Sequence, residues 1–260
     1  MKKITSKIIQ DHVDDVISRK VKRGVYYSHN GCELSLGNLK IGEDTLILNM
    51  GPAYGCPSDT LGKCACSAVC YAKKAEKQYP GARAYRRRQK FYWLQTSADD
   101  ILNDIKHILE NKRFRETYSN RLRPLKQKIQ YLRLNESGDF WSQKCVNKLD
   151  HIARGLRREY NIITYTYTAR DDLHFENCHF AVKGSGHFHG NNGACIVRTQ
   201  AVIDENKSGQ GNAYIEKFHG HTRYFAICPG DCSKCILCKE FNNLNIVFPL
   251  HTSGKKAKKA

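Results

Sequence analysis

Residues 130–166 read QYLRLNESGDFWSQKCVNKLDHIARGLRREYNIITYT, and the fold prediction starts from this stretch. Residues 130–134 and 162–166 are short, largely apolar runs of the kind found in buried strands. Between them we expect a helix over about residues 142–158. A strand, a helix and a second strand in this order indicate a βαβ unit and therefore a parallel sheet.

The alternation extends in both directions from this unit. Toward the N-terminus the sequence predicts a strand at 45–49, a helix at 68–95 and an amphipathic helix at 98–112 capped by Ser97. Toward the C-terminus it predicts strands at 178–182, 194–198, 222–227 and 245–250. We therefore predict an α/β fold, a barrel-like (β/α) sheet, complete or incomplete, with cysteine-rich metal-binding loops at the C-terminal ends of strands.

The predicted organisation is a peripheral segment (1–40), one α/β domain (41–252) and a disordered basic tail (253–260). No apolar run reaches the length of a membrane span, and the N-terminus lacks a signal-peptide core. We expect a cytoplasmic protein, in the host cytoplasm if it is viral, with no membrane partner. In that reducing compartment clustered cysteines indicate metal binding rather than disulfides.

Basic residues outnumber acidic ones, with 43 Lys and Arg against 25 Asp and Glu and a net charge of +18. Such an excess suits a protein that neutralises phosphates, and a solvated surface is the alternative. Several basic residues lie beside aromatic ones, which suits contact with both phosphates and bases. The predicted nucleic-acid contacts are Arg83, Arg86, Arg87, Arg88, Lys90, Tyr165, Tyr167 and Arg170.

Eight of the 12 cysteines fall into two clusters. The first comprises Cys56, Cys64, Cys66 and Cys70, and the second comprises Cys228, Cys232, Cys235 and Cys238, with His251 beyond it. Short spacers let successive thiolates face one metal ion, and buried structural thiols are the alternative. We expect zinc, for which Cys232, Cys235, Cys238 and His251 make a compact set, or alternatively a 4Fe-4S cluster used with S-adenosylmethionine.

The spacing within the second cluster bears on this choice. Cys228, Cys232 and Cys235 have the C-x3-C-x2-C spacing of radical S-adenosylmethionine enzymes. Those enzymes usually carry the motif after the first barrel strand, whereas here it lies near the C-terminus. The cluster that does follow the first predicted strand has a different spacing.

Polar, glycine-rich or cysteine-rich segments follow the predicted strands, at 51–56, 135–140, 168–172, 183–190, 228–232 and 250–254. Because the carboxyl ends of parallel strands meet at one edge, we expect an active site there. Glu136 and Asp139 are three residues apart, so one carboxylate can serve as nucleophile while the other moves a proton. Helix capping is the alternative for this segment. Asp171 follows the next strand and joins the candidates.

Four motifs carry a resemblance to the phage "gene product 88" family over roughly residues 33–252. They are GCPSDTLGKCACSAVCYAKK, YLRLNESGDFWSQ, IITYTYTAR and CPGDCSKCILC with a closing FPLH. The family more often has His-Asp where this chain has Asn135 and Glu136. More loosely, the chain resembles DpdA-like viral relatives of tRNA-guanine transglycosylase, which are barrels with a zinc site of three cysteines and one histidine.

This looser resemblance implies a DNA-guanine transglycosylase-like enzyme that exchanges guanine in DNA for a 7-deazaguanine such as preQ0. Asp139 would attack C1′, and Glu136 or Asp171 would protonate the leaving base. Tyr165 and Tyr167 would hold the flipped nucleotide. Two alternatives stay open: an iron–sulfur, radical S-adenosylmethionine-type enzyme that modifies nucleic acid, and a non-catalytic, zinc-stabilised DNA-binding phage protein.

Overall fold

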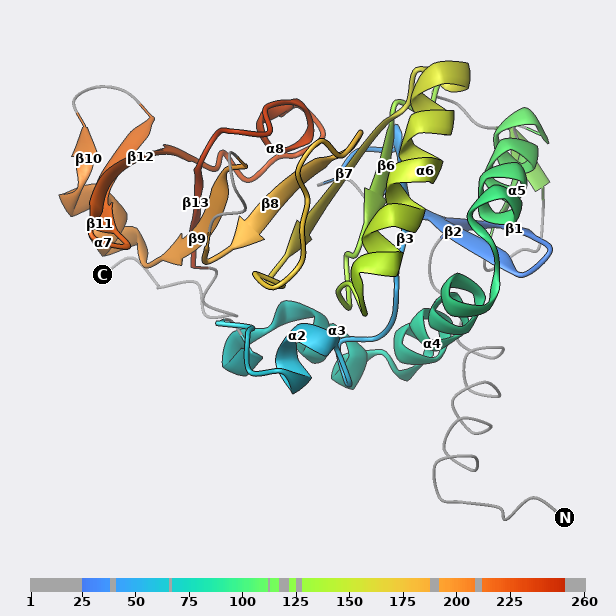
Figure 1. The fold of residues 1–260 in the computed structure, drawn as a ribbon, viewed down its shortest axis with the longest axis horizontal. Helices are drawn as coiled ribbons and strands as arrows, with labels where there is room; N and C mark the ends of the chain where they lie inside the picture. Colours follow the sequence, from blue (N-terminus) through green and yellow to red (C-terminus); the bar gives the residue numbers. More distant parts are fainter. Residues whose placement is uncertain are drawn as a thin grey trace, which may run out of the picture.

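The computed structural model describes residues 25–37, 41–65, 67–111, 113–116, 122–124, 128–187, 192–208 and 212–250. The strands of these residues form one mixed sheet of 13 strands in the order β10-β11-β12-β13-β9-β8-β7-β6-β3-β2-β1-β4-β5. The α/β fold class is confirmed. The sheet has two free edges, at β10 and β5, so it is open and does not form the closed barrel (Figure 1).

The strands are β1 (Val25–His29), β2 (Cys32–Leu36), β3 (Thr45–Leu48), β4 (Arg113–Glu116), β5 (Leu122–Pro124), β6 (Tyr131–Leu134), β7 (Ile163–Thr168), β8 (Ala181–Ser185), β9 (Ala194–Arg198), β10 (Lys207–Ser208), β11 (Ala213–Phe218), β12 (His221–Ile227) and β13 (Ile246–Pro249). The helices are α2 (Pro57–Thr60), α3 (Tyr71–Gln78), α4 (Pro80–Gln95), α5 (Ala98–Asn111), α6 (Gln143–Tyr160), α7 (Gln200–Glu205) and α8 (Leu237–Glu240), with a 3-10 turn at Ser67–Val69.

The centre of the sheet consists of strands that pair in the order in which they occur along the chain. β3, β6, β7, β8 and β9 are parallel neighbours, and β13 continues them beside β9. Leu48 of β3 lies opposite Leu134 of β6, which lies opposite Thr166 of β7. The predicted βαβ unit is therefore confirmed as β6–α6–β7, and the carboxyl ends of β3, β6 and β7 share one edge.

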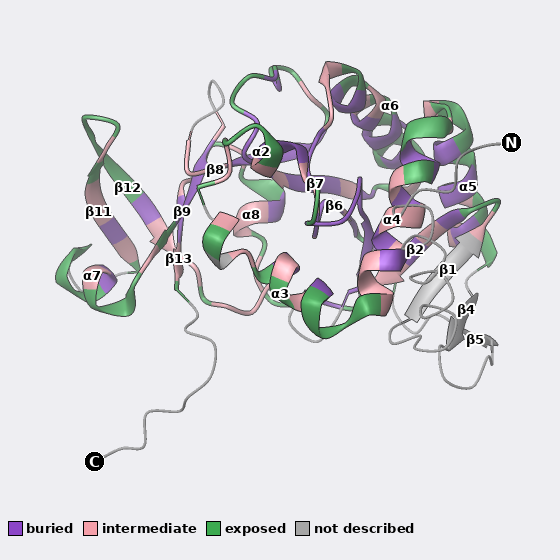
Figure 2. Ribbon diagram, turned by 90° about the horizontal axis from the view of Figure 1, so that it is seen from below, coloured by how far each residue is buried: buried purple, intermediate pink, exposed green. Residues whose placement is uncertain are grey.

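The two faces of this parallel region carry different side chains. Leu132 and Leu134 point to the face covered by α4, α5 and α6, where they join the main hydrophobic core (Figures 1 and 2). Burying one such side chain contributes about 1.5–3 kcal/mol. Because side chains alternate along a strand, Tyr131, Arg133 and Tyr165 point to the opposite face, which α8 and the loop before it cover.

Several elements differ from the sequence prediction. The hairpin of β1 and β2, expected in a peripheral segment, joins the sheet, and Cys32 and Leu34 of β2 are fully buried in the main core. The helix expected at 68–95 is two helices, because Pro80 cannot donate a backbone hydrogen bond and the preceding Tyr79 is not helical. The Ser97 cap is confirmed, since Ser97 Oγ accepts a hydrogen bond from the Asp100 N–H at 3.1 Å.

Some predictions concern residues outside the described ranges. These are residues 1–24 and 38–40 of the expected peripheral segment, Cys66, His251 and the basic tail 253–260. No described helix is both long and apolar enough to cross a bilayer.

Candidate functional site

The segments that follow β3, β6 and β7 are joined at the carboxyl edge by the buried carboxylate of Asp139. Its two oxygens accept hydrogen bonds from Ser58 Oγ at 2.5 Å, Phe140 N at 2.7 Å, Thr168 Oγ1 at 2.7 Å and Ala169 N at 2.8 Å. Burial raises the pKa of the Asp139 carboxyl, whereas these four donors oppose the shift. Asp139 is only 4% exposed, so it connects three loops and presents little surface to a substrate.

A second buried carboxylate, Glu76 of α3, connects the same region to the basic helix α4. Glu76 Oε1 accepts hydrogen bonds from Arg86 Nη1 at 2.9 Å, Ala53 N at 2.7 Å and Ser137 Oγ at 3.0 Å. The Glu76 side chain is fully buried and that of Arg86 is 7% exposed. The other terminal nitrogen of Arg86 lies 3.5 Å from Glu136 Oε2, so Arg86 places Glu136 at the edge of this network.

Gly138 lets the segment after β6 approach the segment after β3. Its φ is +79°, and a Cβ there would lie 2.7 Å from the Gly51 carbonyl oxygen. We expect Gly138→Ala to lower the free energy of unfolding by about 2 kcal/mol, because φ strain and a backbone clash act together. Gly62→Ala is the matched control, since Gly62 has a φ of +69° but no atom within 4 Å of such a Cβ. Equal losses in urea titrations of the two variants would contradict the close-approach argument.

The first cysteine cluster lies at this same carboxyl edge. Cys56 precedes α2 and Cys70 precedes α3, while Cys64 lies in the loop between these helices. Burial raises the pKa of the Cys56 thiol to about 12, and the nearby Asp139 and Cys64 act in the same direction. Lys73, which pairs with Asp59, interacts electrostatically with Cys70 and Cys64. The three described cysteines of this cluster are therefore gathered in one region.

More exposed polar groups surround these cysteines. Lys63 forms an ion pair with Asp171, and the hydrogen bond from Lys63 lowers the pKa of the Asp171 carboxyl. Asp171 is therefore ionised and half exposed. The loop after β8 reaches the same place, because Gly186 lies against Ala65 and His187 interacts electrostatically with Asp171. Burial lowers the pKa of His187.

The second cysteine cluster lies elsewhere, which corrects the expectation that every cysteine-rich loop meets at one edge. The loop at 228–240 contacts the amino ends of strands: Ser233 approaches Gly42, and the Lys239 ammonium lies 4.1 Å from the ring centroid of Tyr131. Gly42 precedes β3, and Tyr131 is the first residue of β6. In Figure 1, α8 accordingly lies on the opposite side of the sheet from α2 and α3. The two clusters are therefore two separate groups of thiols.

The arrangement of potential metal ligands can be stated for the described residues. Among them, no three His, Cys, Asp or Glu side chains are positioned to hold one metal ion. Cys66 and His251, two of the predicted ligands, lie outside these residues. The described cysteines of each cluster lie near one another. Metal binding at either cluster stays a prediction.

The residues predicted to contact nucleic acid are mostly engaged within the protein. Arg86 pairs with Glu76, Arg88 pairs with Glu33, and the Lys90 ammonium lies 3.9 Å from the Trp141 ring centroid. None of the basic residues from Arg83 to Lys90 is fully exposed.

Arg170 is likewise turned inward. It is 5% exposed and donates to both carboxylate oxygens of Asp172 and to the Phe140 carbonyl. Tyr165 is buried, and Tyr167 is partly buried on the face that carries the second cysteine cluster. Contact between these residues and nucleic acid stays a prediction.

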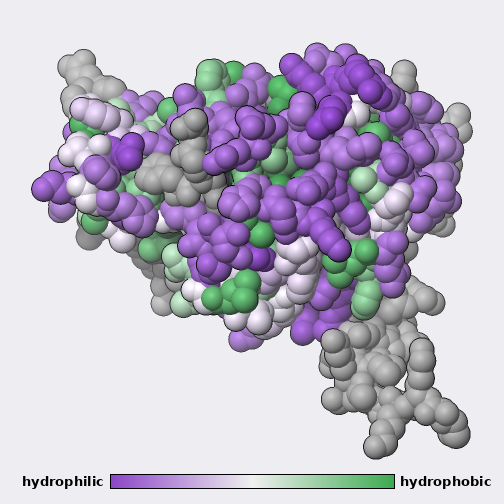
Figure 3. Space-filling view, in the orientation of Figure 1, coloured by the Kyte–Doolittle hydropathy of each residue, from purple (hydrophilic) through white to green (hydrophobic). Residues whose placement is uncertain are grey.

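The surface around the carboxyl edge combines polar and apolar groups. Tyr54, Leu61 and Tyr71 are 41%, 55% and 55% exposed, respectively. In Figure 3 the green patch at the lower edge lies over α2, within a surface that is otherwise largely hydrophilic. The carboxyl-edge loops therefore expose aromatic and aliphatic groups as well as the ion pair of Lys63 and Asp171.

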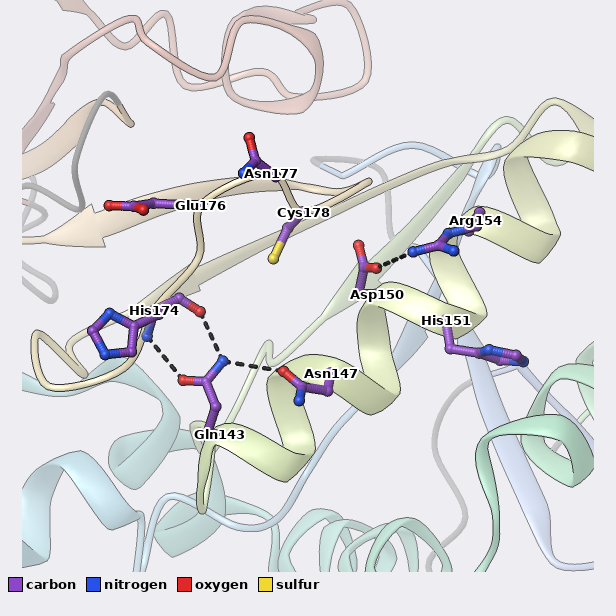
Figure 4. A pocket seen from close by; sticks show the side chains of 9 residues that line it. All are labelled: Gln143, Asn147, Asp150, His151, Arg154, His174, Glu176, Asn177 and Cys178. Atoms are coloured by element: carbon purple, nitrogen blue, oxygen red, sulfur yellow. Dashed lines mark hydrogen bonds and ion pairs between the residues drawn. The ribbon is translucent and has the colours of Figure 1, made fainter.

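A cavity of about 410 Å³ lies between α6 and the loop that follows β7 (Figure 4). Its polar groups largely bond to one another: Gln143 exchanges hydrogen bonds with the backbone of His174, and Asp150 pairs with Arg154. Among its lining residues only Cys178 is a cysteine, and it belongs to neither cluster. This cavity is separate from the carboxyl-edge site.

The connecting residues of the site were not identified from the sequence. Ser58, Lys63 and Thr168 lie within the quoted motifs, but the motifs give them no individual role, and Glu76 lies outside these motifs. Each acquires its role from a partner 22 or more residues away, such as Ser58 with Asp139 or Lys63 with Asp171. The roles of these residues become visible only when the loops are placed together in the folded structure.

Comparison with known proteins gives one positive result. No curated protein and no solved structure matches the chain. The model of one family, described as Gene product 88, matches residues 33–195, which is more than half of the 260 residues and includes the carboxyl-edge site. The chain belongs to the Gene product 88 family.

Proposed function

We propose that this protein is an iron–sulfur enzyme of the radical S-adenosylmethionine type that modifies nucleic acid at the carboxyl edge of its sheet. The observation that carries the proposal is the position of the first cysteine cluster. It directly follows β3, the first strand of an open run of consecutive parallel strands, and Cys56, Cys64 and Cys70 gather there. Radical S-adenosylmethionine enzymes usually carry their cysteine motif at this position, after the first barrel strand.

The donor set suits an iron–sulfur cluster. Cys56, Cys64, Cys66 and Cys70 would supply thiolates, which are the usual ligands of such clusters. A group held by these thiolates would supply one-electron reductive cleavage of S-adenosylmethionine, with the electron coming from a reductant such as dithionite. The C5′–S bond would break to give methionine and a 5′-deoxyadenosyl radical, which would take a hydrogen atom from the substrate.

The chain's own residues would prepare the site for this chemistry. Glu76 and Asp139 hold the loops after β3, β6 and β7 in place through buried hydrogen bonds. Lys63 keeps Asp171 ionised at the rim, where the carboxylate can orient a polar or cationic group of a ligand. The net charge of +18 supports nucleic acid as the substrate class.

The test is an assay for 5′-deoxyadenosine with the full chain, purified without oxygen and supplied with S-adenosylmethionine and dithionite. We expect the wild type to form this product. The double variant Cys64→Ser/Cys70→Ser should form it on the order of tenfold more slowly, or more slowly still. Cys178→Ser is the control, because Cys178 lies in the separate cavity beside α6. An iron-loaded protein that does not cleave S-adenosylmethionine would overturn the proposal.

Base exchange between guanine and a 7-deazaguanine is the second candidate. It is supported by the half-exposed, ionised carboxylate of Asp171, which lies in the loop after β7 at the carboxyl edge. Asp139, the nucleophile expected from the sequence, is less suited because its oxygens already accept four hydrogen bonds inside the protein. Incorporation of labelled preQ0 into DNA that disappears in Asp171→Asn would favour this candidate.

A further inference from the structure

The second cysteine cluster forms a separate site on the face of the sheet opposite α4–α6. A small cavity there is lined by Arg133 of β6, Tyr165 and Tyr167 of β7, and the loop that leads into α8. That loop contributes Cys228, Cys232 and Cys235 of the cluster, and the first turn of α8 contributes Cys238. The Cys228 thiol lies close enough to the other three thiols to interact electrostatically with each of them.

Two basic residues, Arg133 and Lys239, line this cavity, and a third, Lys183, lies buried in the neighbouring strand β8. The Lys183 side chain is fully buried and donates hydrogen bonds only to backbone carbonyls, those of Phe241, Asn242 and Leu244. Lys239 is 3% exposed and lies over the Tyr131 ring. The Nε atom of Arg133 is buried without a hydrogen-bond partner, although its guanidinium lies 5.4 Å from the Tyr167 ring centroid.

These cations have no carboxylate in ion-pair contact within the described part of the chain. Asp231 also lines the cavity, but its side chain is 46% exposed and bonds to Ser233. Burying several charges without a counter-charge is costly, because desolvation is not offset by pairing. A negatively charged group bound in the cavity would offset this cost for Lys239 and Arg133.

Hydrogen bonds converge on one of these sulfurs. Tyr167 and Cys195, a buried residue of β9, both donate to Cys238 Sγ, and Lys183 and Arg133 act on the same sulfur electrostatically. The unsatisfied Nε of Arg133 adds one more donor at the cavity.

We propose that Cys228, Cys232, Cys235 and Cys238 hold an iron–sulfur cluster that is distinct from the carboxyl-edge site. All four ligands come from one run of eleven residues with two- and three-residue spacers, as in the cysteine runs that bind such clusters in ferredoxins. A cluster would retain net negative charge and present sulfurs that accept hydrogen bonds. It would therefore offset the charges of Lys239 and Arg133, which line the cavity, and give the unpartnered Nε of Arg133 an acceptor. The thiols would close around it when it binds.

The test compares iron, sulfide and zinc per chain in three full-length proteins purified without oxygen. They are the wild type, Cys228→Ser/Cys235→Ser and the carboxyl-edge variant Cys64→Ser/Cys70→Ser. We expect Cys228→Ser/Cys235→Ser to lose about four irons per chain. The carboxyl-edge variant should keep the iron that is bound by the second cysteine cluster. Loss of zinc instead of iron, or unchanged iron, would overturn the assignment. If only the proposed function is wrong, the wild type forms no 5′-deoxyadenosine and the carboxyl-edge variant contains as much iron as the wild type. The loss of iron from Cys228→Ser/Cys235→Ser would still be observed.

A second variant covers the case in which the cysteine substitutions prevent folding. Tyr167→Phe removes the hydroxyl that donates to Cys238 but keeps the ring. Because hydrogen bonds to sulfur raise the reduction potential of a cluster, we expect Tyr167→Phe to retain iron and to be harder to reduce in a dye-monitored titration. Cys178→Ser, remote from both clusters, should leave iron content and potential unchanged. A potential that Tyr167→Phe does not lower would contradict the placement of the cluster beside Cys238.

Discussion

Glu76→Gln is expected to lower the free energy of unfolding by about 3–5 kcal/mol, the cost of leaving one partner of a buried ion pair uncompensated. Arg86 is 6% exposed and its Nη1 lies 2.9 Å from Glu76 Oε1. Glutamine keeps the size of the side chain and one acceptor, so the change removes the charge rather than the packing. For a chain of this length the loss corresponds to a decrease in Tm of about 10 °C.

The measurement is urea unfolding followed by circular dichroism, with Glu110→Gln as control. Glu110 is exposed and accepts one hydrogen bond from Tyr160, so its substitution should change stability by less than about 1 kcal/mol. Arg86→Gln combined with Glu76→Gln should cost less than the sum of the single variants, because neither charge is then left alone. Additive losses would show that Glu76 and Arg86 do not act as a pair.

Asp139→Asn is expected to destabilise the protein by about 3 kcal/mol, because an amide cannot accept all the hydrogen bonds that the carboxylate receives. Phe140 N and Thr168 Oγ1 donate to one oxygen, and Ser58 Oγ and Ala169 N donate to the other. The hydroxyls can rotate to accept from an NH2 group, but a backbone N–H cannot. Whichever way the amide is placed, one backbone N–H then faces another donor.

Asp171→Asn is the matched control for this prediction. It is the same chemical change at a half-exposed residue whose ion pair with Lys63 is a surface interaction, so stability should fall by about 1 kcal/mol or less. Thermal unfolding of both variants and of Ser58→Ala gives the comparison. A fully stable Asp139→Asn protein would instead mean that Asp139 does not join the loops, and its role as a nucleophile would regain support.

Local patterns were sufficient for much of the fold. Ile101, Ile105 and Ile108 predicted the buried stripe of α5, and the apolar runs at 130–134 and 162–166 predicted β6 and β7. These predictions succeed because burial on one face requires a regular spacing of apolar residues. The same reasoning missed β10, β11, α7 and α8, which are short or exposed and so leave little periodic signal.

The roles of individual polar residues could not be obtained in this way. Arg86 belongs to a basic block that reads as a phosphate-binding surface, yet in the structure it pairs with Glu76 inside the protein. Asp139 reads equally as a nucleophile or a cap, and its four donors come partly from residues 29 to 81 positions away. Both outcomes depend on partners that no local sequence pattern identifies.

The sequence by itself determined the parallel α/β sheet, the loops at its carboxyl edge and the family, because apolar periodicity and motif residues are local properties of the chain. Only the tertiary structure decided that the sheet stays open and that the two cysteine clusters lie on different sides of it. It also decided which carboxylates are buried and which are exposed. The physical reason is that charge, burial and hydrogen bonding depend on partners brought together from distant segments by packing.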